Sequence, residues 1–263
     1  MTTDRWTSGS HYDQWMGRWS LLLAHEFLQW LDLPAGLRWL DVCCGSGVIT
    51  EAIVERNAPA SVVGIDVSPQ QINFARQHRC KPSVTFQTGD AMSMPFPDAT
   101  FEVVVCGLGL NYVPNPVQAL KEFCRAGTPG GTIAVYLWDY AHGARFLREF
   151  WDAAIAVDHD AAAFDQARRF PMCAPEAMQD LFELAKLENP SLHALEIVTR
   201  FASFDDYWQP LLAGQGSAPN FLATRDEKIQ AAISERLRAA LPTDGDGKIE
   251  LPARAWAIRA HRP

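Results

Sequence analysis

The stretch RWLDVCCGSGVITEAIVERNAPASVVGID, residues 38–66, decides the fold class of this chain. It begins with the apolar run 38–42, passes through a glycine-bearing turn into the helical stretch 50–57, and ends in a second apolar run that closes on Asp66. Short apolar runs of this kind are typical of strands that are buried on both faces. Strand, helix and strand in this order therefore predict a parallel sheet covered by helices.

The same alternation continues to residue 138. Apolar runs predict further strands, at residues 84–87, 101–106 and 132–138. Ser68-Pro69 and Asn115-Pro116 each place a capping side chain before a proline, which predicts a helix start. Gln71 is expected to complete a capping box with Ser68. The first 138 residues thus predict an α/β fold.

Beyond residue 138 the pattern becomes more helical and aromatic. Helical stretches are predicted at residues 140–170, 175–187 and 224–241, and strands at residues 195–201 and 248–259. Thr224 and Glu227 predict a second capping box. Pro252 predicts a bulge or interrupted pairing in the last strand, because proline lacks the N–H that pairs strands.

The composition of the 263 residues excludes several classes of protein. Apolar residues make up 48% and charged residues 21%, which are the proportions of a globular protein. The net charge of −8 predicts that the chain has no nucleic-acid partner. The six cysteines form no Cys-x-x-Cys pair, which indicates free thiols in a reducing compartment and no zinc site. Without a signal peptide or a membrane span, the protein is expected to be soluble and cytoplasmic, with no membrane partner.

The turn after the first strand carries the ligand-binding signal. Gly45 and Gly47 let the backbone approach a ligand closely, and Asp66 stands where a carboxylate can bind both hydroxyls of a ribose. A tight turn without a ligand is the alternative for the glycine pair alone. Thr50 replaces the third glycine of a dinucleotide loop, which disfavours a nicotinamide-dependent oxidoreductase. Asp41, just before the loop, suits a ligand that carries an ammonium group.

Five motifs together carry a resemblance to a known family. They are, in order, residues 40–47, Gly64-Ile65-Asp66-Val67-Ser68, Gly89-Asp90-Ala91, residues 96–102 and Pro129-Gly130-Gly131. With these motifs the chain resembles the class I S-adenosylmethionine-dependent methyltransferases, most of all their small-molecule branch in quinone biosynthesis and natural-product tailoring. The resemblance implies a Rossmann-like, seven-stranded, mostly parallel sheet with helices on both faces. It also implies an antiparallel last strand, while the insertions predict a helical cap.

The resemblance implies S-adenosylmethionine as the cofactor, bound without a metal. Gly45 and Gly47 would face its methionine half. Asp66 would bind the ribose, and Asp90 would hold the adenine with Met92 beside the ring. The full set expected to bind the cofactor is Tyr12, Arg18, Asp41, Gly45, Gly47, Asp66, Val67, Gln71, Asp90, Ala91, Met92, Cys106 and Gly107.

Cys43 departs from the family pattern, because it stands where the family has the first glycine of the loop. We expect its side chain to weaken or re-aim cofactor binding without abolishing it. The resemblance divides the chain into an N-terminal helical lid (1–36), a cofactor-binding core (37–139), and cap insertions with the last helix and strands (140–263). Arg18 in the lid would pair with the methionine carboxylate, a surface charge being the alternative.

Methyl transfer is an in-line displacement in which the protein supplies alignment and sometimes a base. His142 is the first candidate base, because an imidazole titrates near neutral pH. Asn111 and Tyr140 are the further catalytic candidates. Each has an ordinary alternative, namely an exposed histidine, a loop cap and a pocket wall. The aromatic insertions, with Trp151 and Trp208 as their bulkiest members, are expected to set substrate choice, with ordinary helix packing as the alternative.

The predicted function is methyl transfer from S-adenosylmethionine to a small, apolar or aromatic metabolite, with O, N and C all open as acceptor atoms. The alternative is a fold relative that binds the cofactor and has an auxiliary or non-methylating rearrangement role. A DNA or tRNA methyltransferase is disfavoured, because Asn111-Tyr112-Val113-Pro114 replaces the Asn-Pro-Pro-aromatic motif of such enzymes. The glycine-rich loop 214–217 is a candidate lid hinge.

Overall fold

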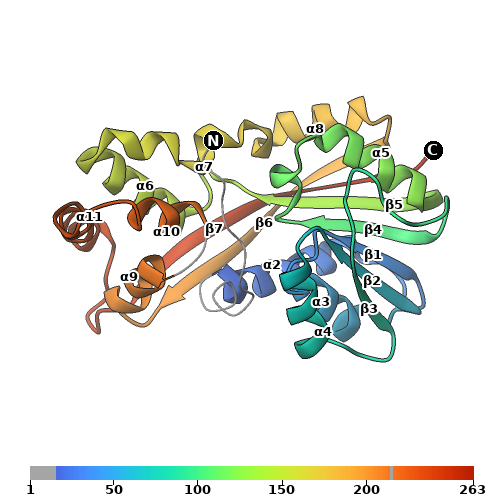
Figure 1. The fold of residues 1–263 in the computed structure, drawn as a ribbon, viewed down its shortest axis with the longest axis horizontal. Coiled ribbons are helices and arrows are strands. Elements are labelled where there is room, and N and C mark those ends of the chain that lie inside the picture. Colours follow the sequence, from blue (N-terminus) through green and yellow to red (C-terminus); the bar gives the residue numbers. More distant parts are fainter. Residues whose placement is uncertain (1–15, 214–215) are drawn as a thin grey trace.

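Seven strands form one sheet in the computed structural model, which describes residues 16–213 and 216–263. Their order across the sheet is β3-β2-β1-β4-β5-β7-β6 (Figure 1). The first five are parallel, whereas β7 runs antiparallel to both β5 and β6. The predicted sheet and its antiparallel last strand are thereby confirmed. The bounds are β1 Arg38–Val42, β2 Ser61–Asp66, β3 Val84–Thr88, β4 Phe101–Gly107, β5 Gly127–Trp138, β6 Glu188–Phe201 and β7 Ile249–His261.

Helices cover both faces of this sheet, as the sequence predicted. Figure 1 shows α2, α3 and α4 on one side, and α5 and α8 on the other. A parallel sheet needs this double cover because its strands are apolar on both faces. The bounds are α2 Arg18–Leu31, α3 Val48–Asn57, α4 Pro69–His78, α5 Pro116–Ala126 and α8 Pro175–Leu184.

The two predicted helix starts form as expected. At α4 the Ser68 hydroxyl accepts a hydrogen bond from the N–H of Gln71 at 3.4 Å, and at α5 the Asn115 side chain accepts one from the N–H of Gln118 at 3.0 Å. The prediction of a capping box at Ser68 is wrong in one respect, because the reciprocal hydrogen bond to the Gln71 side chain does not form. The N–H of Ser68 donates to Asp66 at 2.9 Å instead of to the Gln71 side chain.

Two predictions about the C-terminal half are also wrong. Asp226, and not Thr224, caps α11 (Glu227–Ala240) by accepting a backbone N–H at 2.9 Å. β7 has no bulge at Pro252, which pairs in register with Val198 of β6. The pairing of β7 with β5 ends at Ala255, so β7 has a partner strand on one edge only at this point. A proline is tolerated where one edge of a strand is unpaired.

A second group of helices lies at the far ends of β6 and β7 (Figure 1). Its core is aromatic, with contacts among the rings of Phe150, Trp151, Phe164 and Phe221. Trp151 Nε1 also donates to Gln166 Oε1 at 2.5 Å. The helices of this cap are α6 Arg145–Val157, α7 Gln166–Arg169, α9 Phe204–Ala213, α10 Ser217–Leu222 and α11.

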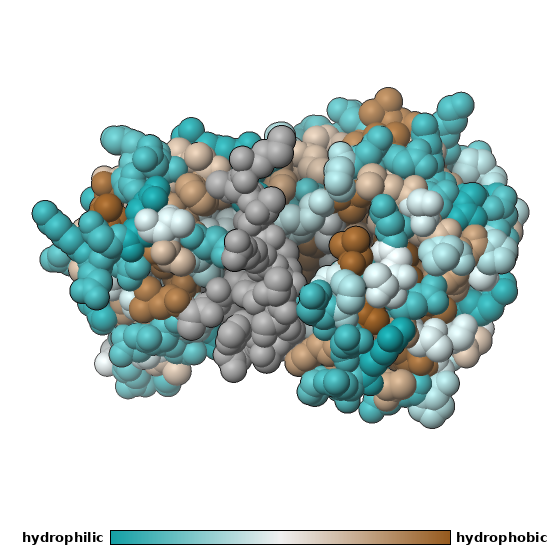
Figure 2. All heavy atoms as spheres, viewed as in Figure 1, coloured by the Kyte–Doolittle hydropathy of each residue, from teal (hydrophilic) through white to brown (hydrophobic). Residues whose placement is uncertain are grey.

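Hydrophilic side chains cover most of the face shown in Figure 2, and apolar ones are interspersed among them. Within residues 16–213 and 216–263, no helix has the length and apolar character that crossing a membrane requires.

Candidate active site

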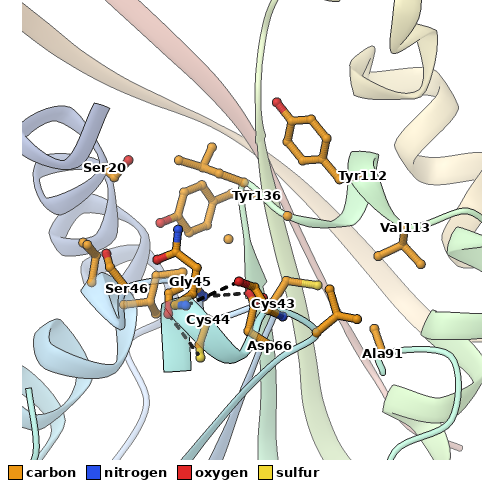
Figure 3. A pocket seen from close by; sticks show the side chains of 18 of the residues that line it. Ser20, Cys43, Cys44, Gly45, Ser46, Asp66, Ala91, Tyr112, Val113 and Tyr136 are labelled. Carbon is orange, nitrogen blue, oxygen red and sulfur yellow. Dashed lines mark hydrogen bonds between the residues drawn. The ribbon is translucent and has the colours of Figure 1, made fainter. Parts of the chain in front are cut away.

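A pocket of about 750 Å³ opens where the parallel strands end (Figure 3). The loop after β1 and the ends of β2 and β3 form one side of it. The segment after β4, the end of β5 and the start of α2 form the other side. This edge of an open α/β sheet is where such folds bind ligands. A volume of this size lies within the usual range of ligand pockets, about 300–1,000 Å³.

The backbone of the loop after β1 is left-handed at three positions. Cys43, Gly45 and Gly47 have φ values of 57°, 52° and 88°, a region that glycine tolerates best. A Cβ at Gly47 would lie 2.9 Å from Cζ of Phe86, so the absence of a side chain there serves packing, and Gly47 does not line the pocket. A Cβ at Gly45 would meet no atom within 4 Å among the described residues beyond its chain neighbours, and Gly45 does line the pocket.

Asp66 ends β2 beside this loop (Figure 3). Its Oδ2 accepts the N–H of Gly45 and its Oδ1 accepts the N–H of Ser68, each at 2.9 Å. Burial is the larger influence and raises the pKa of Asp66, while the two N–H groups lower it. Each carboxylate oxygen has a further lone pair. The side chain can therefore hold the loop and accept hydroxyl groups from the pocket at the same time.

The remaining predicted cofactor residues of β2, β3 and α4 also line the pocket. Asp90 Oδ1 accepts the N–H of Met92 at 2.8 Å, which fixes the turn after β3, and Ala91 lies between them. Val67 lines the rim with 73% of its surface exposed, whereas Gln71 lines the pocket from a buried position. These residues therefore lie together although the sequence spreads them over three elements.

The end of β4 approaches the pocket with bare backbone. Gly107 lines it, and a Cβ there would lie 2.1 Å from Cδ1 of Ile49 and 2.6 Å from the ring of Tyr136. Only glycine fits between these two side chains. Cys106, the preceding residue, is completely buried and does not line the pocket.

The prediction that Asp41 meets a ligand has to be corrected, because the structure places it behind the loop. The side chain is fully buried, and its Oδ2 accepts the hydroxyl of Thr50 at 2.7 Å. Its Oδ1 has no hydrogen-bond partner among the described residues. Burial, the dominant cause, raises the pKa of Asp41 to about 7. A carboxyl in this position is thus only partly ionised at neutral pH.

Asp41→Asn is expected to stabilise the protein more at pH 8 than at pH 5. The pKa of Asp41 is raised by folding from 3.8 to about 7. Its contribution to the free energy of unfolding is therefore present in full below about pH 4 and is lost as the pH rises to about 7. Asparagine cannot ionise, so the variant avoids this loss and gains on the order of 2 kcal/mol at pH 8. Thermal melts at both pH values measure the difference, with Glu55→Gln as an exposed control. Equal gains at both pH values would contradict the raised pKa.

Arg18 does not line the pocket, and its predicted pairing with the methionine carboxylate has to be corrected. Its Nη1 lies 3.2 Å from Oδ1 of Asp206 in α9, and its guanidinium lies 4.5 Å from the ring centroid of Trp19. Arg18 thus links α2 to the cap. Tyr12 and residues 214–215 lie outside the described residues, so the cofactor contact and the hinge predicted there stay predictions.

Of the three catalytic candidates, only Tyr140 lines the pocket. His142 is exposed and outside it, and its N–H donates to Asp139 at 3.0 Å. Asp139 is paired with Arg254, with 2.7 Å between Oδ2 and Nη2. Asn111 is buried without lining the pocket, and its amide has no hydrogen-bond partner among the described residues. The prediction that His142 acts as the general base therefore has to be corrected, because the residue lies outside the pocket.

The far side of the pocket is largely apolar, and most of its residues belong to no motif. Among the residues that the motifs did not identify are Met16, Ser20, Leu108, Val113, Pro114 and Tyr136. Figure 3 shows Ser20, Tyr112 and Tyr136 on this side, across from Asp66. One signal for Tyr136 exists in the sequence, because Tyr136, Trp138 and Tyr140 alternate and alternate residues of a strand face the same side.

The cap tryptophans do not line the pocket, so the prediction that they set substrate choice has to be corrected. Trp151 is buried against Phe150 and Phe221, with ring centroids 4.9 and 5.9 Å away. Trp208 is buried and stacks on Phe204 at 6.2 Å. These rings form the core of the cap, as the alternative of ordinary helix packing predicted.

A family model described as a methyltransferase domain matches residues 40–135. The chain is 36% identical over 137 residues to the 2-phytyl-1,4-naphtoquinone methyltransferase of Thermosynechococcus vestitus. The aligned segment covers 50% of this chain and 60% of that protein. It is 31% identical over 180 residues to the demethylmenaquinone methyltransferase of Bacillus licheniformis, which covers 63% of this chain and 77% of that protein. The chain belongs to the class I S-adenosylmethionine-dependent methyltransferases.

One solved structure shows how far this methyltransferase fold extends. The (4+2)-cyclase SpnF superposes with a TM-score of 0.56 at 22% identity, over 94% of this chain and 80% of that one. The shared architecture is therefore compatible with more than one kind of reaction.

The pocket fits S-adenosylmethionine, the cofactor of this family. The space beside Gly45 is open, and Asp66 keeps acceptor lone pairs for a ribose. Among the described lining residues, the charged side chains are two acids, Asp66 and Asp90, and no Lys, Arg or His is present. That charge suits a ligand that carries a sulfonium and an ammonium group. Within the described part of the chain, no group of three or more His, Cys, Asp or Glu could hold a metal ion.

Proposed function

We propose that this methyltransferase transfers the methyl group of S-adenosylmethionine to a small, planar, apolar acceptor of the quinol type. The observation that carries the proposal is the apolar wall that faces the cofactor loop across one pocket, with Leu108, Tyr112 and Val113 among its members. The relatives named after a phytyl naphthoquinone and demethylmenaquinone support this class of acceptor. The net charge of −8 supports a small molecule rather than a nucleic acid as substrate. The six free cysteines support the reducing cytoplasm as its place of action.

The cofactor is assigned to the motif side of the pocket. Asp66 accepts the ribose hydroxyls, and the bare backbone at Gly45 lies against the methionine half. Asp90 and Met92 hold the adenine, and the backbone of Gly107 faces the amino group. The support for this assignment is their shared pocket, the hydrogen bond from Gly45 to Asp66 at 2.9 Å, and the family pattern.

When it is bound, S-adenosylmethionine supplies a methyl group on a positively charged sulfur, which an acceptor atom displaces in line. The chain contributes alignment and the exclusion of water. Phe170 supports two wall rings, since its centroid lies 5.0 Å from that of Tyr112 and 6.1 Å from that of Tyr140. No His, Asp or Glu belongs to the apolar wall among the described residues. The pocket therefore favours a phenolic or enolic acceptor, which loses its proton without a strong protein base.

Tyr140→Phe is expected to lower kcat about tenfold, the value of one hydrogen bond made in the transition state. The Kd of S-adenosylmethionine should stay unchanged, because Tyr140 lies beyond the cofactor motifs. His142→Ala, an exposed control two residues away, should keep kcat within about twofold. Steady-state kinetics with a soluble naphthoquinol measure both variants. A large loss of kcat in His142→Ala alone would return the basic role to the histidine.

A non-methylating role on the same cofactor site is the second candidate, and the fold shared with a (4+2)-cyclase is the observation that favours it. The two are separated by incubating the protein with S-adenosylmethionine and a panel of naphthoquinols, catechols and flavonoids. Release of S-adenosylhomocysteine in step with a methylated product supports methyl transfer. Cofactor that binds tightly and stays intact with every acceptor favours the second role.

A further inference from the structure

Three free thiols lie in and beneath the floor of the pocket. Cys43 and Cys44 belong to the loop after β1 and line the pocket, and Cys106 belongs to β4. β1 and β4 are paired in parallel, with Asp41 opposite Val105. This pairing brings the residues that follow on each strand close together.

The side chain of Cys43 points toward the exit of β4. A Cβ placed on Gly109 would lie 2.5 Å from Cβ of Cys43. The same point is 3.4 Å from Sγ of Cys43 and 3.4 Å from Sγ of Cys106. Two sulfur atoms from separate elements thus meet at one place, and Gly109 leaves the space for them.

We propose that Cys43 and Cys106 form a redox modification site, in which a reversible disulfide ties the cofactor loop to the end of β4. Both thiols already lie 3.4 Å from one point beside Gly109, so closure needs a movement of the loop and no rearrangement of the sheet. The expected effect on cofactor binding rests on the proposed function, which assigns this loop to the methionine half of the cofactor. Formation of the bond itself does not depend on it.

The step needs a two-electron oxidant, such as diamide or a small disulfide. Both S–H bonds break and one S–S bond forms, while two electrons and two protons pass to the oxidant. With diamide, its N=N bond is reduced to the hydrazine. The pocket is the route of entry, because Cys43 is partly exposed there while Cys106 is completely buried.

Closure changes the shape of the cofactor site. A disulfide bond is about 2.05 Å long, which is shorter than any contact between two thiols that are not bonded, so the loop has to move toward β4. That movement changes the shape of the pocket wall, because Cys43 and Gly109 both line the pocket and already lie in contact. Oxidised protein should therefore bind S-adenosylmethionine about tenfold more weakly. Bound cofactor should in turn slow oxidation, because it covers Cys43.

The experiment treats the full chain with diamide, alkylates the remaining thiols after unfolding, and maps the peptides by mass spectrometry. The expected product links the peptide that contains Cys43 to the peptide that contains Cys106. Titration of oxidised and re-reduced protein with S-adenosylmethionine should show the tenfold difference, and reduction with dithiothreitol should reverse it. Cys44→Ser identifies the loop cysteine, because the link should persist in this variant.

Matched variants separate the outcomes. Cys80→Ser removes an exposed thiol and should leave both the link and the loss of affinity in place. Cys43→Ala and Cys106→Ser should each remove both, and circular dichroism checks that they fold. Recovery of Cys43 and Cys106 as alkylated thiols after diamide treatment would overturn the proposal, as would a link from Cys44. A link that forms in a protein with no affinity for the cofactor would instead count against the proposed function alone.

Discussion

Asp66→Ala is expected to raise the Kd of S-adenosylmethionine about 100-fold. The carboxylate accepts the N–H of Gly45 and the N–H of Ser68 and, in the proposed function, the ribose hydroxyls. Hydrogen bonds to a charged group contribute about 1.5–3 kcal/mol each, and a factor of 100 in Kd corresponds to about 2.7 kcal/mol. Alanine removes the ribose contacts and releases the loop together. Isothermal titration calorimetry at fixed salt measures the change.

Two further variants make the Asp66 result specific. Asp66→Asn keeps the volume and one acceptor oxygen but loses the charge, so its affinity should fall between those of the wild type and the alanine variant. Asp98→Asn removes an exposed carboxylate that pairs with Arg125 outside the pocket and should leave Kd unchanged. Unchanged affinity for S-adenosylmethionine in a folded Asp66→Ala protein would contradict the assignment of Asp66 to the ribose.

Gly45→Ala is expected to raise the Kd of S-adenosylmethionine by about 30-fold or more. The new methyl group meets no atom of the described residues within 4 Å apart from its neighbours in the chain, so it projects into pocket space that the cofactor is proposed to fill. At φ +52° alanine is also strained, and the variant should lose about 1–2 kcal/mol of stability. Thermal melts and calorimetry separate the two effects.

Gly36→Ala is the matched control for Gly45→Ala. Gly36 has φ +82°, its added Cβ would also meet nothing within 4 Å, and it does not line the pocket. The two variants should therefore lose similar stability, while affinity falls only in Gly45→Ala. Equal affinity in both would show that the space beside Gly45 is not used by the cofactor.

Local sequence was sufficient for the sheet and for most of the motif side of the pocket. Strands and helices follow from short apolar runs and from caps such as Ser68 and Asn115, which act over three residues. Asp66 and Asp90 could be predicted as neighbours because they end adjacent parallel strands, and the ends of such strands meet at one edge. These inferences need topology alone, and the order of strands and helices along the chain supplies it.

Only the tertiary structure decided which side chains reach the pocket. Asp41 and Arg18 are drawn away by Thr50 and Asp206, partners that local patterns do not identify. The aromatic insertions pack on one another instead of on the pocket, since rings from several helices gain most by burying a shared core.

At Cys43 the sequence determined one feature and the tertiary structure decided another. The sequence determined that a side chain stands where the family has glycine. The structure decided where that side chain goes: toward β4, into space that a Cβ at Gly109, 66 residues later, would otherwise fill. A packed interior couples such distant positions because two atoms cannot share one volume, and no pattern along the chain records that coupling.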